Sequence, residues 1–131
     1  MAENKRQTVS SGTTWEKLAG YSRAMRVGNR ILVSGTTATG ANGEVVGVGD
    51  VGAQTDFILR KIETVVSQLG GTMNDIVRTR IYLRNVDDWE PAARVHGEWF
   101  GTILPANTLV EAKLVGDNYL VEIEAEAVVN G

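Results

Sequence analysis

The sequence predicts an α+β domain in which two helices cover one face of a mixed β-sheet. Three observations support this fold class. Segments that alternate apolar and polar residues surround two longer segments with helical spacing, in the order ββαβαββ. Each long helix lies between two strands, so both can pack on the same sheet face through crossover connections. The chain of 131 residues has no linker and no internal repeat, which predicts a single domain over 1–131.

The sequence of the N-terminal region predicts a flexible tail that is followed by a short helical turn. Residues 1–8 are expected to form a flexible tail. Thr13 and Glu16 have the spacing of a capping box, which predicts one helical turn that ends near Leu18.

A β-hairpin is predicted next in the chain. Strands are expected over 23–27 and 30–36, and Gly28-Asn29 suits the turn between them because both residues tolerate positive φ. The glycine-rich segment 35–49 is expected to be an ordered loop. It lacks the spacing of a phosphate-binding loop.

A long amphipathic helix is predicted over 51–69. Asp50 is a suitable N-cap, and Gly70-Gly71 commonly ends such a helix. Lys61 falls outside the apolar stripe of this helix. The residues that recur at spacings of three and four are Ile58, Ile62, Val65, Val66 and Leu69.

A further strand and a second helix follow. Alternation over 76–84 predicts the strand. The helix is expected to begin at Asp87 or Asp88 and to end at Phe100, with Pro91 tolerated in its first turn.

The last two strands are predicted over 108–115 and 120–129, as neighbours. With both helices on one side, the opposite sheet face is expected to be exposed, although the strands carry apolar residues on more than one face. A bare and partly apolar sheet face is usually covered by another subunit, so the sequence predicts an oligomer.

Composition argues against several classes of function. The chain has no cysteine, which removes disulfides and thiolate chemistry, and its single histidine, His96, argues against a His-based triad or a metal site. The net charge of −3 argues against nucleic-acid binding, which needs a basic surface. No apolar run is long enough to cross a membrane, and no signal peptide is recognised. A cytoplasmic protein without a cofactor or metal is therefore expected.

Several segments together resemble one protein family. They are Gly20-Tyr21-Ser22, 31–36, Leu69-Gly70-Gly71, 75–79, Leu104-Pro105-Ala106 and 121–125. Their order over residues 20–128 is similar to that in the Rid family (reactive intermediate deaminase A, also named YjgF/YER057c/UK114 or L-PSP endoribonuclease). The resemblance implies a chorismate-mutase-like fold and a cytosolic homotrimer whose sheets line a central barrel. It also implies that a small metabolite binds in the cleft between subunits.

The same resemblance implies an activity and a set of site residues. Deaminating members of the family hydrolyse reactive enamines and imines, such as 2-aminoacrylate, to a 2-keto acid and ammonia. Carried over by position, Tyr21 and Glu122 are the catalytic candidates, with Glu122 orienting water. Ser34 and Gly35 are ligand-binding candidates, because a glycine at a strand end lets a ligand approach free backbone groups.

Two positions depart from the family pattern. Asn107 stands where the family usually has an arginine that holds the substrate carboxylate, and Ala93 stands where deaminating members often carry an asparagine. Loss of a charge-assisted arginine pair is expected to weaken carboxylate binding about 10-fold to 100-fold. Asn107 is therefore either a plain strand residue or part of a cleft retuned for a less acidic ligand. A third alternative is that another arginine supplies the charge, from among Arg23, Arg26 and Arg94.

Three glutamates share one face of the last predicted strand, namely Glu122, Glu124 and Glu126. For Glu124 and Glu126 we expect cross-strand pairing with arginines of the 76–84 strand, which are Arg78, Arg80 and Arg84. Glu122 is either paired in the same way or serves as a general base, which needs a carboxylate close to a water molecule.

Three functions remain open from the sequence. The first is an imine or enamine deaminase with a substrate preference altered by Asn107. The second is a non-catalytic trimer that binds a metabolite and has lost the chemistry. The third, an endoribonuclease, is disfavoured by the acidic chain and its single histidine.

Overall fold

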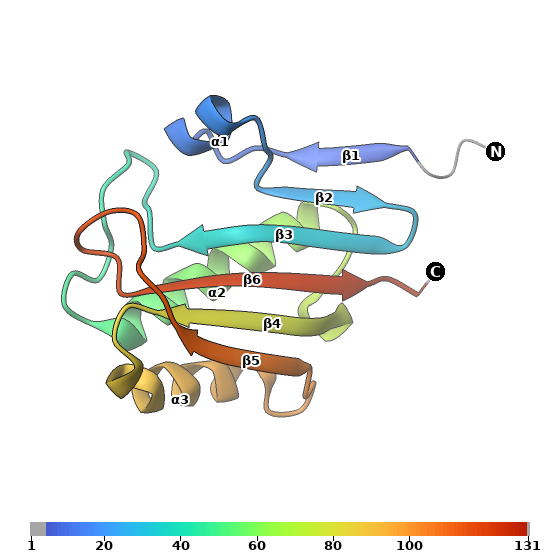
Figure 1. The fold of residues 1–131 in the computed structure, drawn as a ribbon. Coiled ribbons are helices and arrows are strands. Elements are labelled where there is room, and N and C mark those ends of the chain that lie inside the picture. The colour runs from blue at the N-terminus through green and yellow to red at the C-terminus, as the bar shows by residue number, and fades with distance from the viewer. Residues whose placement is uncertain (1–4, 131) are drawn as a thin grey trace.

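The computed structural model describes residues 5–130 and contains a six-stranded sheet (Figure 1). The strands are β1 (Arg6–Val9), β2 (Ala24–Val27), β3 (Arg30–Thr37), β4 (Ile76–Leu83), β5 (Ala106–Glu111) and β6 (Val121–Val128). The helices are α1 (Thr14–Ala19), α2 (Val51–Gln68) and α3 (Trp89–Phe100), with 3-10 turns η1 (Met73–Asp75) and η2 (Val86–Asp88). The α+β prediction is confirmed, because α2 and α3 lie together on one face of the sheet.

The strand order is β1-β2-β3-β6-β4-β5. β4 and β5 run parallel, whereas the other neighbours run antiparallel, so the predicted mixed sheet is confirmed. The expectation that the last two strands are neighbours is wrong, because β4 lies between them. The crossover through α3 returns the chain parallel to β4 at the edge of the sheet. β6, whose inner side chains are fully buried, takes the central place between β3 and β4.

The tail predicted over 1–8 needs a correction. Residues 6–9 form β1, an edge strand in which Arg6 lies opposite Val27 and Val9 lies opposite Ala24. Three of its four side chains are exposed, so the strand is stabilised mainly by backbone hydrogen bonds. Because these bonds do not depend on the side chains, the strand shows no alternating apolar pattern in its sequence. Residues 1–4 of the predicted tail lie outside the described residues.

Capping side chains mark the beginnings of two helices. Thr13 accepts a hydrogen bond from the backbone N–H of Glu16 at 3.4 Å, and Asp50 accepts one from that of Ala53 at 3.0 Å. Both caps satisfy donors that the first helical turn leaves free. α2 ends before Gly70, whose φ of 88° lies in the left-handed region that favours glycine. These helix limits agree closely with the predicted ones.

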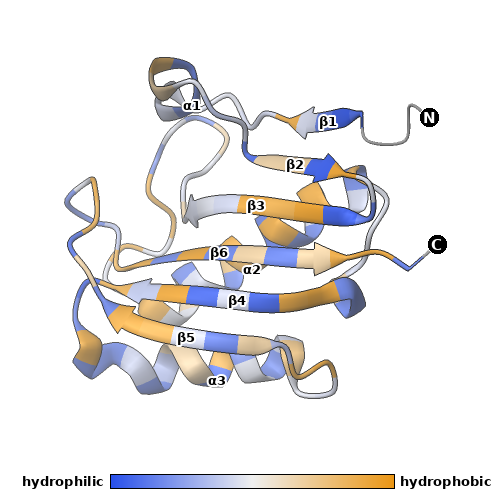
Figure 2. Cartoon of the chain, turned by 45° about the vertical axis from the view of Figure 1, so that its right-hand side comes forward, coloured by the Kyte–Doolittle hydropathy of each residue, from blue (hydrophilic) through white to orange (hydrophobic). Residues whose placement is uncertain are grey.

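The core lies between the sheet and the two long helices. Apolar side chains alternate with polar ones along β4 and β6, and the apolar stripe of α2 packs on the inner side (Figure 2). The largest fully buried side chains include Ile31, Ile58, Leu59, Ile62, Ile81, Leu83 and Ile123. This packing holds β3, β6 and α2 in place, and these three elements supply one part of the wall of the cavity described below.

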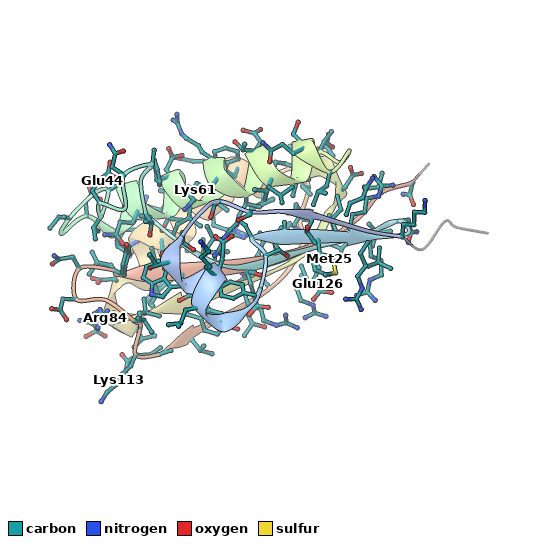
Figure 3. The ribbon with its side chains drawn as sticks, turned by 90° about the horizontal axis from the view of Figure 1, so that it is seen from above. Met25, Glu44, Lys61, Arg84, Lys113 and Glu126 are labelled. Atoms are coloured by element: carbon teal, nitrogen blue, oxygen red, sulfur yellow. The ribbon has the colours of Figure 1, made fainter. Side chains whose placement is uncertain are left out.

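The open face of the sheet is mainly charged. Arg80 forms ion pairs with Glu124 at 3.1 Å and with Glu126 at 3.5 Å. Figure 3 shows Glu126 and Met25 on this side of the sheet, opposite to α2. Leu32, which is 41% exposed, adds apolar surface here. Exposed apolar side chains also occur on β4 and β5, where Val77 is 45% and Val110 is 43% exposed, so the expectation of a partly apolar open face is correct.

Candidate functional site

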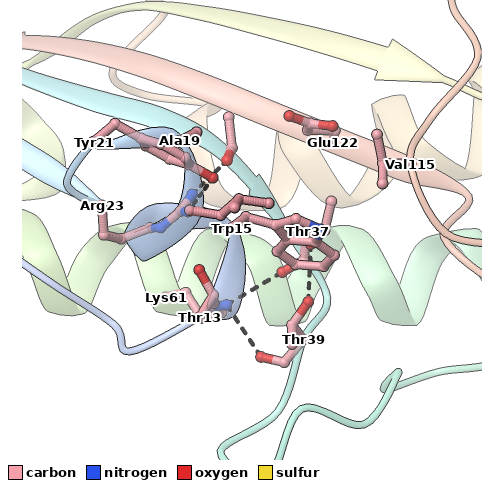
Figure 4. Close-up of a pocket in the computed structure, with 12 residues that line it drawn as sticks. Thr13, Trp15, Ala19, Tyr21, Arg23, Thr37, Thr39, Lys61, Val115 and Glu122 are labelled. Carbon is pink, nitrogen blue, oxygen red and sulfur yellow. Dashed lines mark hydrogen bonds between the residues drawn. The ribbon is translucent and has the colours of Figure 1, made fainter.

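A cavity of about 280 Å³ lies between α1, the residues that precede β2, the end of β3, and β6 (Figure 4). It brings together Tyr21, Gly35 and Glu122, which the resemblance assigned to one site. Trp15 from α1 and Lys61 from α2 line the same cavity. Segments far apart in the sequence therefore meet at this point of the fold.

Glu122 differs from the other two glutamates on the outer side of β6. No residue within 5–130 donates a hydrogen bond to its carboxylate, which lines the cavity. Glu124 instead accepts hydrogen bonds from Tyr82 and Arg80. Glu126 is held by arginines, namely Arg30, Arg78 and Arg80. The predicted cross-strand pairing is therefore observed for Glu124 and Glu126, whereas the carboxylate of Glu122 remains available to a water molecule.

The third predicted pairing arginine has another role. Arg84 donates to backbone oxygens of the loop before β6, at 2.7 Å from Tyr119 O and 3.1 Å from Leu114 O. It holds this loop and takes no part in the glutamate pairs of β6.

Gly35 allows the close approach of Glu122. A Cβ built on Gly35 would overlap the Glu122 carboxylate, so no larger residue fits here without a shift. The pairing of β3 with β6 also changes register between Val33 and Thr36. Such irregularities re-aim side chains and are common beside functional sites.

The pKa of Glu122 is raised, and the largest cause is burial. The positive charge of Arg23 opposes this shift, and the negative charge of Glu124 adds to it. A carboxylate with a raised pKa accepts a proton more readily than an ordinary one. Glu122 is therefore suited to take a proton from water at near-neutral pH.

Arg23 is a buried cation in the cavity wall, with only 3% of its surface exposed. Its Nη1 donates to Gly35 O and, at 3.2 Å, to Thr36 Oγ1. Its Nη2 lies 3.4 Å from Glu16 Oε2 and 3.4 Å from Tyr21 Oη. Arg23 therefore ties the backbone at Gly35 to the side chain of Tyr21.

Glu16 fixes Arg23 from behind the cavity. Its carboxylate accepts hydrogen bonds from Ser10 Oγ at 3.0 Å, from Ser11 N at 3.0 Å and from Thr13 Oγ1 at 2.8 Å, and also from Ser11 Oγ. Burial alone raises the pKa of Glu16, but these hydrogen bonds lower the pKa to about 2. Glu16 thus stays ionised and balances the charge of Arg23.

Lys61 is a second cation at the cavity. Its Nζ donates to Thr37 O at 3.3 Å and to Thr39 O at 3.1 Å. Burial lowers the pKa of Lys61, and the positive charge of Arg23 lowers it further, while Glu16 raises it. The side chain is therefore a partly desolvated amine held against the end of β3.

Aromatic side chains complete the walls. Tyr21 is 40% exposed, and the Arg23 guanidinium lies 5.5 Å from the centre of its ring. Trp15 packs edge-on against Tyr119, with ring centres 6.0 Å apart. Trp15 and Tyr21 therefore give the cavity an apolar wall beside the charged side chains of Glu122 and Lys61.

Asn107 lies away from this cavity within one chain. Its Nδ2 donates to Thr79 Oγ1 at 3.0 Å, and that hydroxyl lies 2.8 Å from His96 Nε2. Thr79 is fully buried on the helix side of β4, whereas Glu122 points to the other side of the sheet. The Thr79 hydroxyl thus joins Asn107 to His96, and burial lowers the pKa of His96.

Two further predicted residues do not line the cavity. Ser34 donates its hydroxyl proton to Ser22 O at 2.8 Å, so it joins β3 to the segment that precedes β2. Ala93 lies on α3, on the helix side of the sheet.

Of the three arginines considered as replacements for the missing charge, only Arg23 lines the cavity. Arg26 donates to Leu69 O at 2.8 Å, at the end of α2. Arg94 pairs with Glu90 at 2.5 Å on the exposed side of α3.

Lys61 and Trp15 were not predicted as site residues. Lys61 follows Ile58 by three residues and precedes Val65 by four, so it borders the apolar stripe of α2. That spacing was a usable signal. No sequence pattern indicates that α1, which carries Trp15, covers the end of the sheet.

Neither a metal-binding cluster nor a membrane-spanning helix is found among the described residues. No three His, Asp or Glu side chains within 5–130 gather in a way that could hold a metal ion. In the same range, no helix is long and apolar enough to cross a membrane.

Sequence comparison identifies relatives of the whole domain. The profile of the family described as Endoribonuclease L-PSP matches residues 13–129. The 3-aminoacrylate deaminase RutC of Acinetobacter baylyi is 36% identical over 110 residues, covering 84% of this chain and 87% of that protein. A RutC family protein of Pyrococcus abyssi is 34% identical over 108 residues, covering 82% of this chain and 84% of that protein.

Structure comparison agrees with these matches. A member of the YjgF/YER057c/UK114 family from Mycobacterium tuberculosis has a TM-score of 0.86 and 43% identity, covering 95% of this chain and 100% of that chain. The Rid-family protein YyfA of Yersinia pestis, of unknown function, has a TM-score of 0.84 and 27% identity, with 95% and 100% coverage. The fold is thus the chorismate-mutase-like α+β fold of this class of small proteins. The chain belongs to the Rid family, also named YjgF/YER057c/UK114 or L-PSP endoribonuclease.

Proposed function

We propose that this protein hydrolyses reactive imines or enamines to a carbonyl compound and ammonia. The observation that carries the proposal is the carboxylate of Glu122, which lines the cavity without a protein hydrogen-bond donor among the described residues. The similarity to a 3-aminoacrylate deaminase supports the same reaction class. An acidic enamine or its imine tautomer is the substrate type that follows.

The reaction needs one water molecule and one proton acceptor. Glu122 takes a proton from water while the water oxygen bonds to the C=N carbon, and it returns this proton to the nitrogen, which gives a neutral carbinolamine. Glu122 then moves the hydroxyl proton of the carbinolamine to the nitrogen, so that the C–N bond breaks and ammonia leaves as the carbonyl forms. Microscopic reversibility allows the same carboxyl group to act first as base and then as acid.

The other cavity residues position the substrate. Because Gly35 has no side chain, a substrate can approach its backbone closely. Arg23 donates a hydrogen bond to the carbonyl oxygen of Gly35 and so fixes the backbone there. The Tyr21 hydroxyl lies beside Arg23 and is available for a hydrogen bond to the substrate nitrogen or to the attacking water. Pre-positioned donors of this kind stabilise charge that develops as the bond forms.

A homotrimer with the site in its clefts is part of the proposal. The open sheet face, with Leu32 exposed, supports self-association. Within one chain, Asn107 and Ala93 lie on the opposite side of the sheet from Glu122. In an assembled protein they would therefore reach a cleft only from a neighbouring subunit. Short-lived imines are produced inside cells, which fits the expected cytoplasmic location.

The direct test is hydrolysis of an imine made in the assay. An amino-acid oxidase generates a 2-imino acid, an amine oxidase generates a neutral imine, and release of the carbonyl product is followed with and without the protein. We expect faster release from at least the acidic imine. An identical rate with and without protein for both imines would reject the proposal.

A second candidate function is binding of a metabolite without turnover. It is favoured by Asn107, because this neutral residue stands where the family usually has a carboxylate-binding arginine. The amide of Asn107 donates to Thr79 within the chain. A keto acid would then raise the thermal unfolding midpoint while no imine was hydrolysed. The ribonuclease activity in the family description is not supported here, because the chain carries a net charge of −3.

A further inference from the structure

The cavity contains one cation whose charge is already balanced. Arg23 is paired with Glu16 at 3.4 Å, and both side chains are almost fully buried. Its Nη1 and Nη2 atoms are committed to Gly35 O, Thr36 Oγ1, Glu16 and Tyr21. Its Nε is buried away from solvent, without a partner among the described residues. Arg23 is therefore a structural cation with no accessible donor left for a ligand.

Lys61 is different, because no carboxylate of the described residues forms an ion pair with it. Within residues 5–130 it forms no ion pair, and its two hydrogen bonds go to the neutral carbonyl oxygens of Thr37 and Thr39 (Figure 4). An ammonium group has three N–H donors, so one is left. Burial lowers the pKa of Lys61 and the charge of Arg23 lowers it further, while the charge of Glu16 opposes both effects.

Glu122 does not provide a counter-ion for Lys61. It lines the same cavity but makes no ion pair with Lys61. The cavity of about 280 Å³ thus has a cation contributed by α2 and a free carboxylate contributed by β6. A 2-imino acid carries its carboxylate next to its C=N carbon. Bound with the carboxylate at Lys61, it would leave that carbon accessible to water held by Glu122.

We propose that Lys61 binds the carboxylate of the substrate and makes the cavity selective for acidic imines. This inference rests on the proposed function for the identity of the substrate, but the binding itself does not require turnover. It assigns to Lys61 the charge that residue 107 lacks. Lys61 is thus a specificity-determining residue, while Arg23 and Glu16 form the rigid wall beside it.

The test measures binding of a stable product-like anion. Pyruvate and its uncharged analogue pyruvamide are titrated into the wild type and into Lys61→Gln, Lys61→Arg and Arg60→Gln proteins by calorimetry. Arg60 is the matched control, because it is the neighbouring residue on α2 and its side chain is 70% exposed. Thermal unfolding of each variant checks that it is folded.

We expect Lys61→Gln to bind pyruvate about 10-fold to 100-fold more weakly than the wild type, since a charge-assisted contact is lost. Its affinity for pyruvamide should not change. Lys61→Arg should keep most of the pyruvate affinity, and Arg60→Gln should keep all of it. A lysine with only a structural role would not cause a loss of affinity that is confined to pyruvate and spares pyruvamide.

Three results would overturn the inference. These are no measurable binding of pyruvate to the wild type, equal losses for pyruvate and pyruvamide in Lys61→Gln, or a borohydride-trapped adduct on Lys61 that identifies a nucleophile instead. Failure of the proposed function looks different. Pyruvate would then bind in a Lys61-dependent way while the protein hydrolysed no imine.

Discussion

The carboxylate of Glu122 occupies the space in which a side chain of residue 35 would begin, so that only glycine fits at that position without a shift. The two residues lie on neighbouring strands, β6 and β3, where the pairing changes register. At this point of the cavity, therefore, a ligand can reach the backbone of Gly35 and also meet the Glu122 carboxylate, which has no donor among the described residues. The proposed chemistry depends on this juxtaposition.

Replacing Gly35 by alanine should displace the Glu122 carboxylate and lower activity. The group that must move is the free end of a flexible side chain that faces the cavity, so the loss of stability should stay below about 1 kcal/mol. Gly97→Ala is the matched control, because a Cβ there meets nothing within 4 Å. It should be neutral or stabilising by up to about 1 kcal/mol, since alanine is the better helix former. Thermal unfolding and an imine assay check both variants, and full activity in Gly35→Ala would argue against this contact.

The pH dependence of the rate should report the ionisation of Glu122. The base form is required, so kcat/KM should rise with pH as the carboxyl group loses its proton. Burial raises the pKa of Glu122, so this rise should occur above the ordinary value of 4.5. The same rise should be missing in Glu122→Gln. A profile that keeps it in the variant would assign the titration to another group.

Glu16 should make the stability of the fold depend on pH in acid. Its folded-state pKa of about 2 lies below the ordinary value of 4.5, so folding favours the charged form. The resulting stability is fully present above about pH 4.5 and is lost as the pH falls towards 2. A difference of this size corresponds to about 3 kcal/mol.

Glu16→Gln tests this dependence by chemical denaturation at several pH values. At pH 7 the variant should be less stable than the wild type by about 3 kcal/mol, and the gap should shrink as the pH approaches 2. Glu63→Gln removes the same charge from an exposed position on α2 and should change stability little. A gap that stays constant with pH would show that the ionisation of Glu16 is not its source.

The fold was predictable where local patterns are strong. α2 carries a clear apolar stripe with a cap at Asp50, and β4 and β6 alternate along most of their length. β1 was not predictable, because a polar edge strand is held by backbone hydrogen bonds that leave no trace in its sequence. The place of β5 beside β4 follows from a crossover through α3, which depends on how the elements pack.

The site was predictable only in part. Tyr21, Gly35 and Glu122 could be grouped through the family resemblance. Glu122 differs from Glu124 and Glu126 because its carboxylate has no arginine partner. That difference follows from the register of β4 and β6, which places arginines opposite Glu124 and Glu126 and a tyrosine opposite Glu122. The contact of Asn107 with Thr79 likewise depends on the parallel register of β4 and β5.

Asn107→Ala should affect stability more than substrate binding. The hydrogen bond to Thr79 is lost, which costs about 1 kcal/mol. The KM for an acidic imine should stay within about twofold of the wild-type value, because Lys61 provides the charge. Unfolding experiments and steady-state kinetics measure the two effects. A KM raised about tenfold or more at unchanged stability would instead place Asn107 against the substrate across a subunit interface.

The central claim is that Glu122 is the base that activates water. The most direct measurement compares kcat for hydrolysis of a 2-imino acid by Glu122→Gln and by Glu63→Gln, both checked for a wild-type unfolding profile. General-base catalysis predicts that kcat falls about 100-fold or more in Glu122→Gln and remains at the wild-type value in Glu63→Gln. A Glu122→Gln protein with a wild-type kcat would contradict the account.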